Sequence, residues 1–452
     1  VEVELRDGDT HIVLEVGDAD GRWQIFFKND LNVGADFDVA ELTSYERWVT
    51  TYDTLTNDRL SAQRESSRHF PRRPLISILV PVYNTPEKWL VRAIESVRRQ
   101  LYENWELCIA DDASKEPHVR KILEAYQKKD ARIKVVLRET NGHISASSNS
   151  ALALAHGEFL ALLDHDDEIR PHALACVALE INAHPAADLI YSDEDKIDDT
   201  GRRYDPQLKG SWSPEMAITH NYTHHLSVIR RSIIEQAGRL RPEFNGAQDI
   251  DLFLRCWELI QPEDVIHVPF IGYHWRAHAE STATRGDQKG YLFEAARQGI
   301  AEAVQRRGLR AEPMLPDFAK HYALCLHQLK WDATLLRDNP VTIVIPTKNR
   351  VDLLRPCLDS LARTTPREFV KIIVVDDNSD DDATIAYLQT LPDRTDLRCV
   401  VLPAGLPAEP LASKQKAAAA TARFNYSRLV NLGTAQADTP LVLHLNNDVE
   451  AL

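Results

Sequence analysis

Residues 75–82 read LISILVPV, an apolar run followed by a helical pattern that begins at Thr85-Pro86. Two further apolar runs, WELCIA at 105–110 and IKVVL at 133–137, are separated by a second helical pattern. Apolar runs that alternate with amphipathic helices predict a parallel sheet covered by helices. The chain is therefore expected to contain an α/β domain, with polar residues where its strands end.

The same alternation of apolar runs and helical patterns continues through EFLALL and DLIYS and starts again at Val341. A polar, Arg-rich stretch at 59–73 precedes the first apolar run and is expected to be a linker. The predicted divisions are an N-terminal β element, helix and linker (1–73), an α/β domain (74–310), a helical connector (311–339) and the first half of a second α/β domain (340–452).

An internal repeat supports this second domain. VPVYN at 80–84 matches IPTKN at 345–349, and DDAS at 111–114 matches DDNS at 376–379. Both pairs share an offset of 265 residues (346 − 81 and 376 − 111). Two copies of one α/β unit are therefore expected.

Further along the chain the offset of the repeat grows. Asn149 matches Asn431 and Asp166 matches Asp448, both at an offset of 282 (431 − 149 and 448 − 166). The second copy thus carries 17 extra residues (282 − 265), which we place in PAGLPAEPLASKQKAAAA at 403–420.

The composition is typical of an ordered globular protein. The 452 residues are 44% hydrophobic and 27% charged, which leaves enough apolar surface for two or three domains. A net charge of -15 argues against a nucleic-acid partner. The sequence contains no apolar run of about 18 residues, so no transmembrane helix is expected.

The cysteines and the first residues indicate which metal sites, disulfides and cellular location to expect. The six cysteines show no C-x-x-C spacing, so neither a zinc site nor a disulfide framework is predicted. The sequence starts at Val1 without a signal-peptide pattern, and we expect a segment of a longer cytoplasmic protein. Peripheral association with the inner face of the cell membrane is compatible with this expectation.

Polar groups end three of the predicted strands. PVYN at 81–84, DDAS at 111–114 and DHD at 164–166 each follow an apolar run. Ligands of open α/β sheets bind beyond the carboxyl ends of the strands, where these groups should meet. Carboxylate oxygens suit Mg²⁺ or Mn²⁺, and a D-x-D can share such an ion with the phosphates of a ligand. Alone, each group could instead be a turn or a helix N-cap.

This order of motifs resembles glycosyltransferase family 2, the inverting nucleotide-sugar enzymes with the GT-A fold. The resemblance runs from residue 75 to about 282 and restarts at 341. It implies binding of a nucleotide-diphosphate sugar by Pro81, Tyr83, Asn84, Asp111, Asp112, Asn149, Asp164 and Arg276. It also implies that Asp164 and Asp166 hold Mn²⁺ or Mg²⁺, with Asp166 favoured as the metal ligand, and that a late histidine joins them, for which His274 fits better than His278.

The resemblance also implies a general base. In NGAQDIDLFLR at 245–255, Asp249 matches the family's base, while Gln248 replaces the glutamate that usually precedes it. Asp249 could otherwise be only a helix N-cap. The region between the D-x-D and the base shapes the acceptor pocket in this fold, and its candidate acceptor contacts are Asp193, Glu194, Asp195 and His225. A charged turn or edge strand is the alternative for these four.

The resemblance implies transfer of a sugar to a hydroxyl of a growing glycan or lipid-linked glycan, of O-antigen or capsule type. Two rivals are a nucleotidyltransferase, which needs a Gly- and Arg/Lys-rich loop absent here, and a non-catalytic nucleotide-sugar-binding module. A Rossmann dehydrogenase would need G-x-G-x-x-G after the first strand, where PVYNTPEKW contains no glycine. The second copy ends in Asn446-Asn447-Asp448 and is expected to be truncated.

Overall fold

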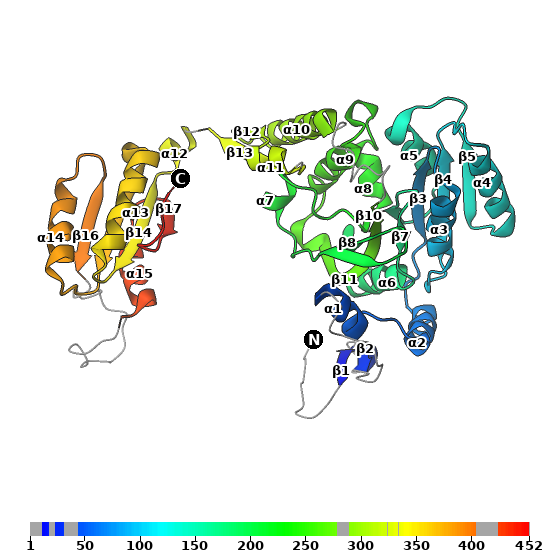
Figure 1. Cartoon of the computed structure of the whole chain (residues 1–452), viewed down its shortest axis with the longest axis horizontal. Helices are drawn as coiled ribbons and strands as arrows, with labels where there is room; N and C mark the ends of the chain where they lie inside the picture. The colour runs from blue at the N-terminus through cyan, green and yellow to red at the C-terminus, as the bar shows by residue number, and fades with distance from the viewer. Residues whose placement is uncertain are drawn as a thin grey trace. The chain divides into compact units, whose positions relative to one another are not determined.

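The structure is a computed structural model that describes residues 11–17, 23–30, 44–277, 289–322, 324–332, 334–403 and 424–451. The chain divides into two compact units, residues 1–330 and 331–452 (Figure 1). Among the described helices, none combines the length and the apolar character that spanning a bilayer requires.

The first unit is built on a nine-stranded sheet of order β5-β4-β3-β6-β10-β8-β11-β7, with β9 paired to β8. Its first four strands are parallel to one another. They are β3 (Ile76–Val82), β4 (Trp105–Asp111), β5 (Ile133–Leu137) and β6 (Phe159–Leu162). Because these strands are parallel, their carboxyl ends lie at one edge of the sheet, where the polar motifs were expected.

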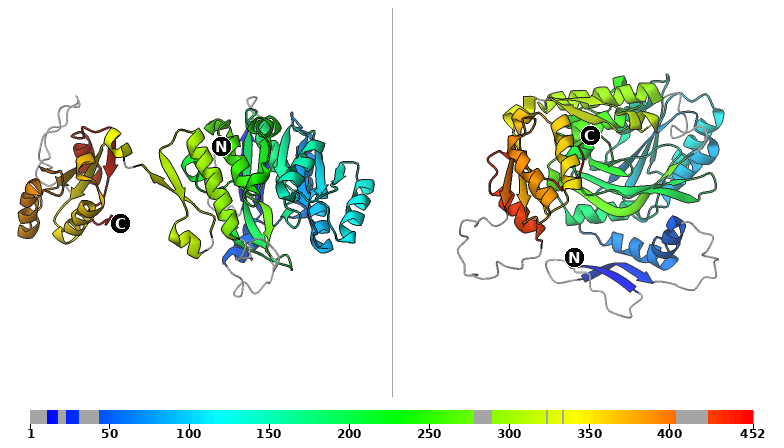
Figure 2. Two further views of the ribbon diagram at one scale, coloured as in Figure 1. Left: turned by 90° about the horizontal axis from the view of Figure 1, so that it is seen from above. Right: turned by 60° about the vertical axis from the view of Figure 1, so that its left-hand side comes forward.

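Helices cover both faces of this sheet (Figure 2). Alternate residues of β3 face opposite ways: Ile78 packs with one buried cluster and Leu79 with the other. One face carries α3 (Glu87–Arg98), α4 (Pro117–Lys129) and α6 (Ala173–Ala183). The other carries α5 (His143–Leu154), α8 (Arg231–Ala237), α9 (Gln248–Trp257) and α10 (Lys289–Arg306). The predicted α/β fold is confirmed.

The second half of the sheet mixes strand directions. Its strands are β7 (Glu168–Ile169), β8 (Leu189–Ile197), β9 (Arg203–Gln207), β10 (Ser227–Arg230) and β11 (Val265–Arg276). β10 is antiparallel to both β6 and β8, whereas β8 and β11 are parallel. A short helix, α7 (Pro214–Ala217), lies between β9 and β10 in the chain. This half brings β7, directly after the D-x-D, against β11.

The N-terminal region contains an antiparallel pair, β1 (His11–Gly17) and β2 (Trp23–Asp30), and two helices. The helices are α1 (Ser44–Tyr52) and α2 (Asn57–Arg68). Helix α2 occupies much of the stretch that the sequence suggested was a linker, and Leu60 and Phe70 pack against the core. Apolar side chains at these two positions explain why the polar stretch is folded onto the domain.

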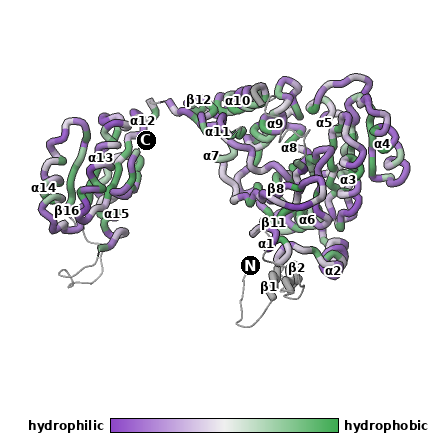
Figure 3. Tube along the Cα trace, viewed as in Figure 1, coloured by the Kyte–Doolittle hydropathy of each residue, from purple (hydrophilic) through white to green (hydrophobic). Residues whose placement is uncertain are grey.

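The second unit repeats the parallel part of the first sheet. Its strands are β14 (Val341–Thr347), β15 (Val370–Asp376), β16 (Cys399–Pro403) and β17 (Leu441–His444), in the order β16-β15-β14-β17. All are parallel. Its helices are α13 (Val351–Thr364), α14 (Asp382–Thr390) and α15 (Tyr426–Thr434). Hydrophobic residues follow the strands of both units (Figure 3).

Between the two sheets, residues 311–339 contain more than the helical connector that the sequence predicts. A two-stranded sheet is formed by β12 (Ala311–Met314) and β13 (Gln328–Trp331). Two short helices accompany it, α11 (Asp317–His321) and α12 (Thr334–Asp338). The proposed insertion at 403–420 lies, apart from Pro403, outside the described residues.

Candidate active site

A polar cradle follows the carboxyl ends of β3 and β4. Asn84, at a positive φ of 49°, donates its backbone N–H to Ser114 Oγ at 2.8 Å. The Asn84 side-chain oxygen accepts the backbone N–H of Lys115 at 2.7 Å, and Asp111 accepts that of Ser114 at 3.3 Å. Asparagine tolerates this left-handed backbone better than most residues. The two strand ends are therefore locked together.

Asp112 lies at the base of the cradle and is only 2% exposed. Its carboxylate accepts Arg138 Nε at 2.7 Å and the backbone N–H of Gly142 at 3.0 Å. An ionised carboxylate has about four acceptor sites, so Asp112 retains capacity for a ligand donor. Tyr83, on the same edge, is 40% exposed. Pro81 lies within β3, one residue before its end.

Asn149 does not contribute to this cradle. Its side-chain amide donates to the carbonyl of Leu240 at 2.8 Å and its oxygen accepts the Leu240 N–H at 3.2 Å. Both polar ends of the amide are thus used to join α5 to the segment after α8. A nucleotide contact at Asn149 stays a prediction, and the structure gives its amide this structural role.

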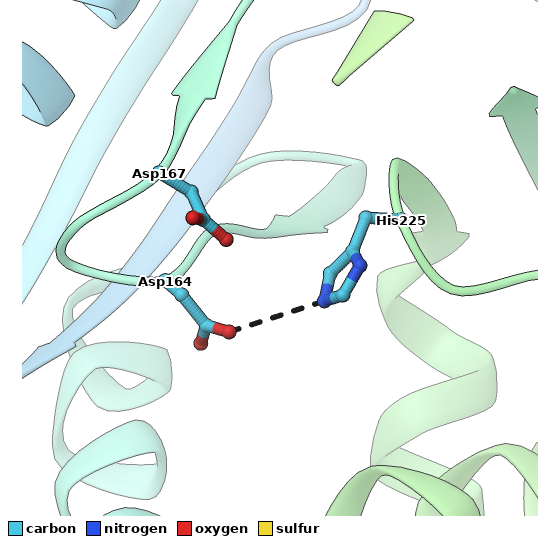
Figure 4. Close-up of side chains that lie close together, drawn as sticks. All are labelled: Asp164, Asp167 and His225. Carbon is cyan, nitrogen blue, oxygen red and sulfur yellow. Dashed lines mark ion pairs between the residues drawn. The ribbon is translucent and has the colours of Figure 1, made fainter. Parts of the chain in front are cut away.

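Three side chains that could hold a metal ion converge after β6. Donor atoms of Asp164, Asp167 and His225 all lie within 4.8 Å of one another. His225 Nε2 is 3.9 Å from Asp164 Oδ2 (Figure 4). Asp164 is half-exposed, whereas the other two side chains are almost fully buried.

Asp167 is held from the strand β11. Its carboxylate accepts the hydroxyl of Tyr273 at 2.6 Å and the backbone N–H of Arg276 at 2.7 Å. Burial, together with the negative charges of Asp166 and Asp164, raises the pKa of Asp167 well above its ordinary value. A cation beside these three carboxylates would relieve their mutual repulsion.

The predicted metal ligands were Asp164, Asp166 and His274, and only Asp164 belongs to the cluster of donor atoms. Asp164 is in the cluster, but the described histidine beside it is His225 rather than His274, whose Nδ1 contacts Asp195. Asp166 follows Asp164 in the same turn, and its backbone carbonyl accepts Arg276 Nε at 2.8 Å. His278, the other late histidine, lies outside the described residues.

Arg276, for which a contact with the diphosphate stays a prediction, is held inside the protein beside the D-x-D. Its side chain is fully buried, bonded to Glu168 and to the carbonyl of Asp198, with the guanidinium 4.1 Å from the ring centre of Trp89. The register of β11 against β8 and β7 turns this residue inward. Arg276 therefore braces the loop that carries the D-x-D.

Asp249 lies in the first turn of α9, where a carboxylate is favoured by the helix dipole. Its Oδ2 accepts Asn221 Nδ2 at 3.3 Å and lies 3.6 Å from Nδ1 of His224. Burial raises the pKa of Asp249 above its ordinary value, which makes the carboxylate a stronger base. The preceding Gln248 accepts the backbone N–H of Gly246 and so supports the turn before the helix.

Two adjacent histidines connect Asp249 with the acid cluster. His224 lies beside Asp249, and His225 lies beside Asp164. Burial lowers the pKa of His224 well below its ordinary value, which favours the neutral form of its ring. No sequence motif assigned an individual role to His224 or Asn221. The visible signal was the unusual His-His pair in NYTHHL.

The three acidic residues of β8, predicted as acceptor contacts, are buried and bonded within the protein. They are at most 5% exposed, and each already accepts hydrogen bonds from the protein. Asp193 accepts His267 Nε2 and the Lys209 N–H, both at 2.8 Å. Glu194 bonds to His225, and Asp195 accepts the hydroxyl of Tyr45 at 2.6 Å. These carboxylates position neighbouring groups, and His225 belongs to the acid cluster.

The donor set fits a divalent cation. Within the described residues, the buried Nε2 of His225 has no hydrogen-bond partner. An imidazole nitrogen and two carboxylates form a ligand set that proteins use for such ions. Asp164, Asp167 and His225 are therefore the residues that could hold the metal.

Comparison with known proteins gives the chain a family. The family model described as glycosyl transferase family 2 matches residues 77–238 and 342–406, together half of the chain. The chain is 38% identical to the uncharacterized protein y4gI of Sinorhizobium fredii over 86% of this chain and 40% of y4gI. It is 33% identical to the O-antigen biosynthesis protein RfbC of Myxococcus xanthus, over 91% of this chain and 30% of RfbC.

The chain thus spans less than half the length of both relatives. Among solved structures, S. aureus TarS 1–349 in complex with UDP-GlcNAc matches with a TM-score of 0.42 and 22% identity, over 51% of this chain and 66% of TarS. The two family matches contain the strand-end motifs, the acid cluster and the histidine pair. The chain belongs to glycosyltransferase family 2.

Proposed function

We propose that the first unit is an inverting, metal-dependent glycosyltransferase that uses a nucleotide-diphosphate sugar. The observation that carries this proposal is the histidine pair: His224 contacts Asp249, and His225 contacts the acid cluster. A base for the acceptor and a charge centre for the leaving diphosphate are the two groups that such a transfer requires. The pair supports placing both beside one reaction centre.

The donor nucleotide binds at the cradle. Tyr83 covers one face of the base, and Asp112 accepts an N–H of the base or a ribose hydroxyl. Asn84 and Asp111 keep the two strand ends in register for this contact. Exposure of Tyr83 and the spare acceptor capacity of Asp112 support these roles.

Asp249 removes the proton of the acceptor hydroxyl while that oxygen attacks the anomeric carbon. Attack comes from the face opposite the diphosphate, so the anomeric configuration inverts. Asn221 and His224 orient the carboxylate of Asp249 during this step. A divalent ion, Mn²⁺ or Mg²⁺, held by Asp164, Asp167 and His225, with Asp166 next to them, would supply positive charge for the diphosphate.

The acceptor is a hydroxyl of a growing surface glycan or of a lipid-linked glycan. The likeness to a relative named as an O-antigen biosynthesis protein supports this class. Such an acceptor is compatible with a cytoplasmic enzyme at the inner face of the cell membrane. Residues 340–452 are proposed to be the first half of a second domain of the same family, which the match at 342–406 supports.

A donor screen tests the proposal. The purified chain is incubated with Mn²⁺ and with UDP-, GDP- and dTDP-sugars, and nucleotide release and transfer are measured. We expect turnover of one donor class, lost in Asp249→Asn and kept in Asp199→Asn, a change at an exposed position. Nucleotide binding without turnover of any donor would indicate a binding module instead of an enzyme.

A further inference from the structure

The ring of His225 is held in one orientation by Glu194. Glu194 Oε2 lies 2.9 Å from His225 Nδ1 and also accepts the backbone N–H of His225 at 2.8 Å. Lys209 Nζ, 3.7 Å from the same oxygen, supplies a positive charge nearby. A carboxylate that accepts at Nδ1 requires the proton on that nitrogen. When the ring carries a single proton, that proton is therefore on Nδ1, and Nε2 has a lone pair.

Within the described part of the chain, no hydrogen-bond donor contacts this lone pair on His225 Nε2. Nε2 is buried without a hydrogen-bond partner and points toward Asp164, with Asp167 beside it (Figure 4). Both neighbours are carboxyl groups, and in the ionised form that a bound cation would favour they accept hydrogen bonds and do not donate them. A buried nitrogen left in this way is unfavourable. A cation satisfies the nitrogen and both carboxylates at once.

The spacing also suits a cation. Two ligands about 2.1 Å from one ion can lie up to about 4.2 Å apart when they are on opposite sides of it. The distance of 3.9 Å between His225 Nε2 and Asp164 Oδ2 falls within that span. The carboxylate–histidine arrangement is the usual support of a metal-binding imidazole, whose second nitrogen donates to a carboxylate.

We propose that Glu194 is a positioning residue that makes His225 a nitrogen ligand, and that the site consequently prefers a transition ion such as Mn²⁺ to Mg²⁺ or Ca²⁺. Mg²⁺ and Ca²⁺ are bound mainly by oxygen, whereas imidazole favours transition ions. This inference rests on the proposed metal-dependent transfer and names the ion class and the residue that selects it. Glu194 acts by orienting the imidazole of His225. Its own carboxylate is not among the metal-donor atoms that cluster with Asp164 and Asp167.

The experiment measures binding of Mn²⁺ alone to the full chain, by calorimetry and by pulsed EPR. We expect ¹⁴N coupling to bound Mn²⁺ in the wild-type protein and its loss in His225→Ala. Glu194→Gln should weaken Mn²⁺ binding 10- to 100-fold, in line with changes at other metal-supporting carboxylates. Mg²⁺ affinity should change less than about 3-fold, because oxygen ligands dominate its binding.

Glu106→Gln is the matched control. Glu106 is also a buried glutamate with a lysine partner, Lys134 at 2.5 Å, but it lies near the start of β4, at the opposite end of the strand from the cradle. We expect Mn²⁺ affinity and the ¹⁴N coupling to be unchanged in this variant. If His225→Ala does not fold, His225→Gln takes its place, and Glu194→Gln gives the same comparison without changing the histidine.

Persistence of the ¹⁴N coupling in the His225 variant, or equal losses of Mn²⁺ and Mg²⁺ affinity in Glu194→Gln, would overturn the inference. Absence of the coupling from wild-type protein that binds Mn²⁺ would also overturn it, and would indicate a protonated His225 paired with Asp164. These outcomes are separate from the donor screen. Turnover that depends on Asp249 but not on Mn²⁺ ligation by His225 refutes this inference alone, whereas His225-dependent coupling without any turnover refutes the transferase.

Discussion

At the residue scale, Asp249 is the side chain on which turnover should depend most. Asp249→Asn keeps the shape of the side chain and removes the base, so we expect kcat to fall about 10²- to 10⁴-fold. The dissociation constant of the donor nucleotide should change less than about 3-fold, because the cradle lies on β3 and β4 and Asp249 lies on α9. Steady-state kinetics together with nucleotide titration measure both. A large loss of nucleotide affinity with normal kcat would contradict the assignment.

The pH profile is a second test of Asp249. Burial raises its pKa, and the deprotonated form is the base, so kcat/KM should rise with pH through that raised pKa. The hydrogen bond from Asn221 acts in the opposite direction and lowers the pKa of Asp249. Asn221→Ala should therefore move the rising limb to higher pH. An unchanged limb in Asn221→Ala, or the same limb in Asp249→Asn, would assign the titration to another group.

The sequence could place candidate residues along the chain but not the direction of their side chains. Tyr83, Asp112 and Asp164 follow strands whose ends are visible in the apolar pattern, so their shared edge could be predicted. Arg276 and Asn149 also lie near the motifs, yet the structure turns the first inward and bonds the second to the Leu240 backbone. Those directions depend on strand register and on distant partners, which no local spacing encodes.

At the element scale, helix α1 and the turn after it are joined to the catalytic unit by charges. Asp53 Oδ2 is 2.5 Å from Arg170 and 2.6 Å from Arg203. These arginine side chains are only 6% and 14% exposed. Arg203 also reaches Asp195, which accepts the hydroxyl of Tyr45. Asp53 therefore bridges two buried guanidinium groups, and Asp195 is a second carboxylate partner of Arg203.

Loss of Asp53 should destabilise the fold. Asp53→Asn leaves Arg170 and Arg203 buried without their shared carboxylate, and we expect the free energy of unfolding to fall by about 3 kcal/mol. Tyr45→Phe removes one hydrogen bond to a charged group and should cost about 1.5 kcal/mol. Urea denaturation measures both. Glu65→Gln, which breaks the exposed pair with Arg68, is the control and should leave the urea midpoint unchanged.

Helices and strands were predictable from the sequence where a local pattern of apolar residues marks their buried face. Helix α3 buries Leu90, Ile94 and Val97, the apolar positions that its spacing marks. Helix α2 was hidden because its composition is polar and Leu60 is its one hydrophobic residue that packs against the core, so no apolar stripe marks it. The parallel pairing of β8 with β11 joins segments more than 70 residues apart and depends on the whole sheet. Such long-range pairing leaves little trace in either strand.

At the scale of the whole molecule, the repeat seen in the sequence extends to strand register. Val82 pairs with Asp111 in the first unit, and Thr347 pairs with Asp376 in the second. The cradle repeats as well: Asn349 donates its backbone N–H to Ser379 Oγ at 2.7 Å, at a φ of 54°. The internal offset of 265 residues thus predicted three-dimensional equivalence (347 − 82 and 376 − 111). Equivalence of backbone does not extend to equivalence of chemistry, since Lys348 replaces the tyrosine of the first cradle.

Turnover by this chain should depend on the first unit alone. Asp448 is the counterpart of Asp166, but it follows Asn446 and Asn447, so the second cluster has one carboxylate where the first has three (Asp164, Asp166 and Asp167). No residue described after β17 corresponds to His225 or to Asp249, the groups that complete the first site.

Asp448→Asn should therefore leave kcat within about 2-fold of wild type. Asp166→Asn, the same change in the first unit, should lower kcat at least about 10²-fold, as expected for loss of a charge-stabilising group. Both variants are compared in the donor assay at saturating Mn²⁺, with thermal unfolding as a check that each is folded. Equal losses in the two variants would show that the units act together in one reaction, and a loss confined to Asp448→Asn would move the active site to the second unit.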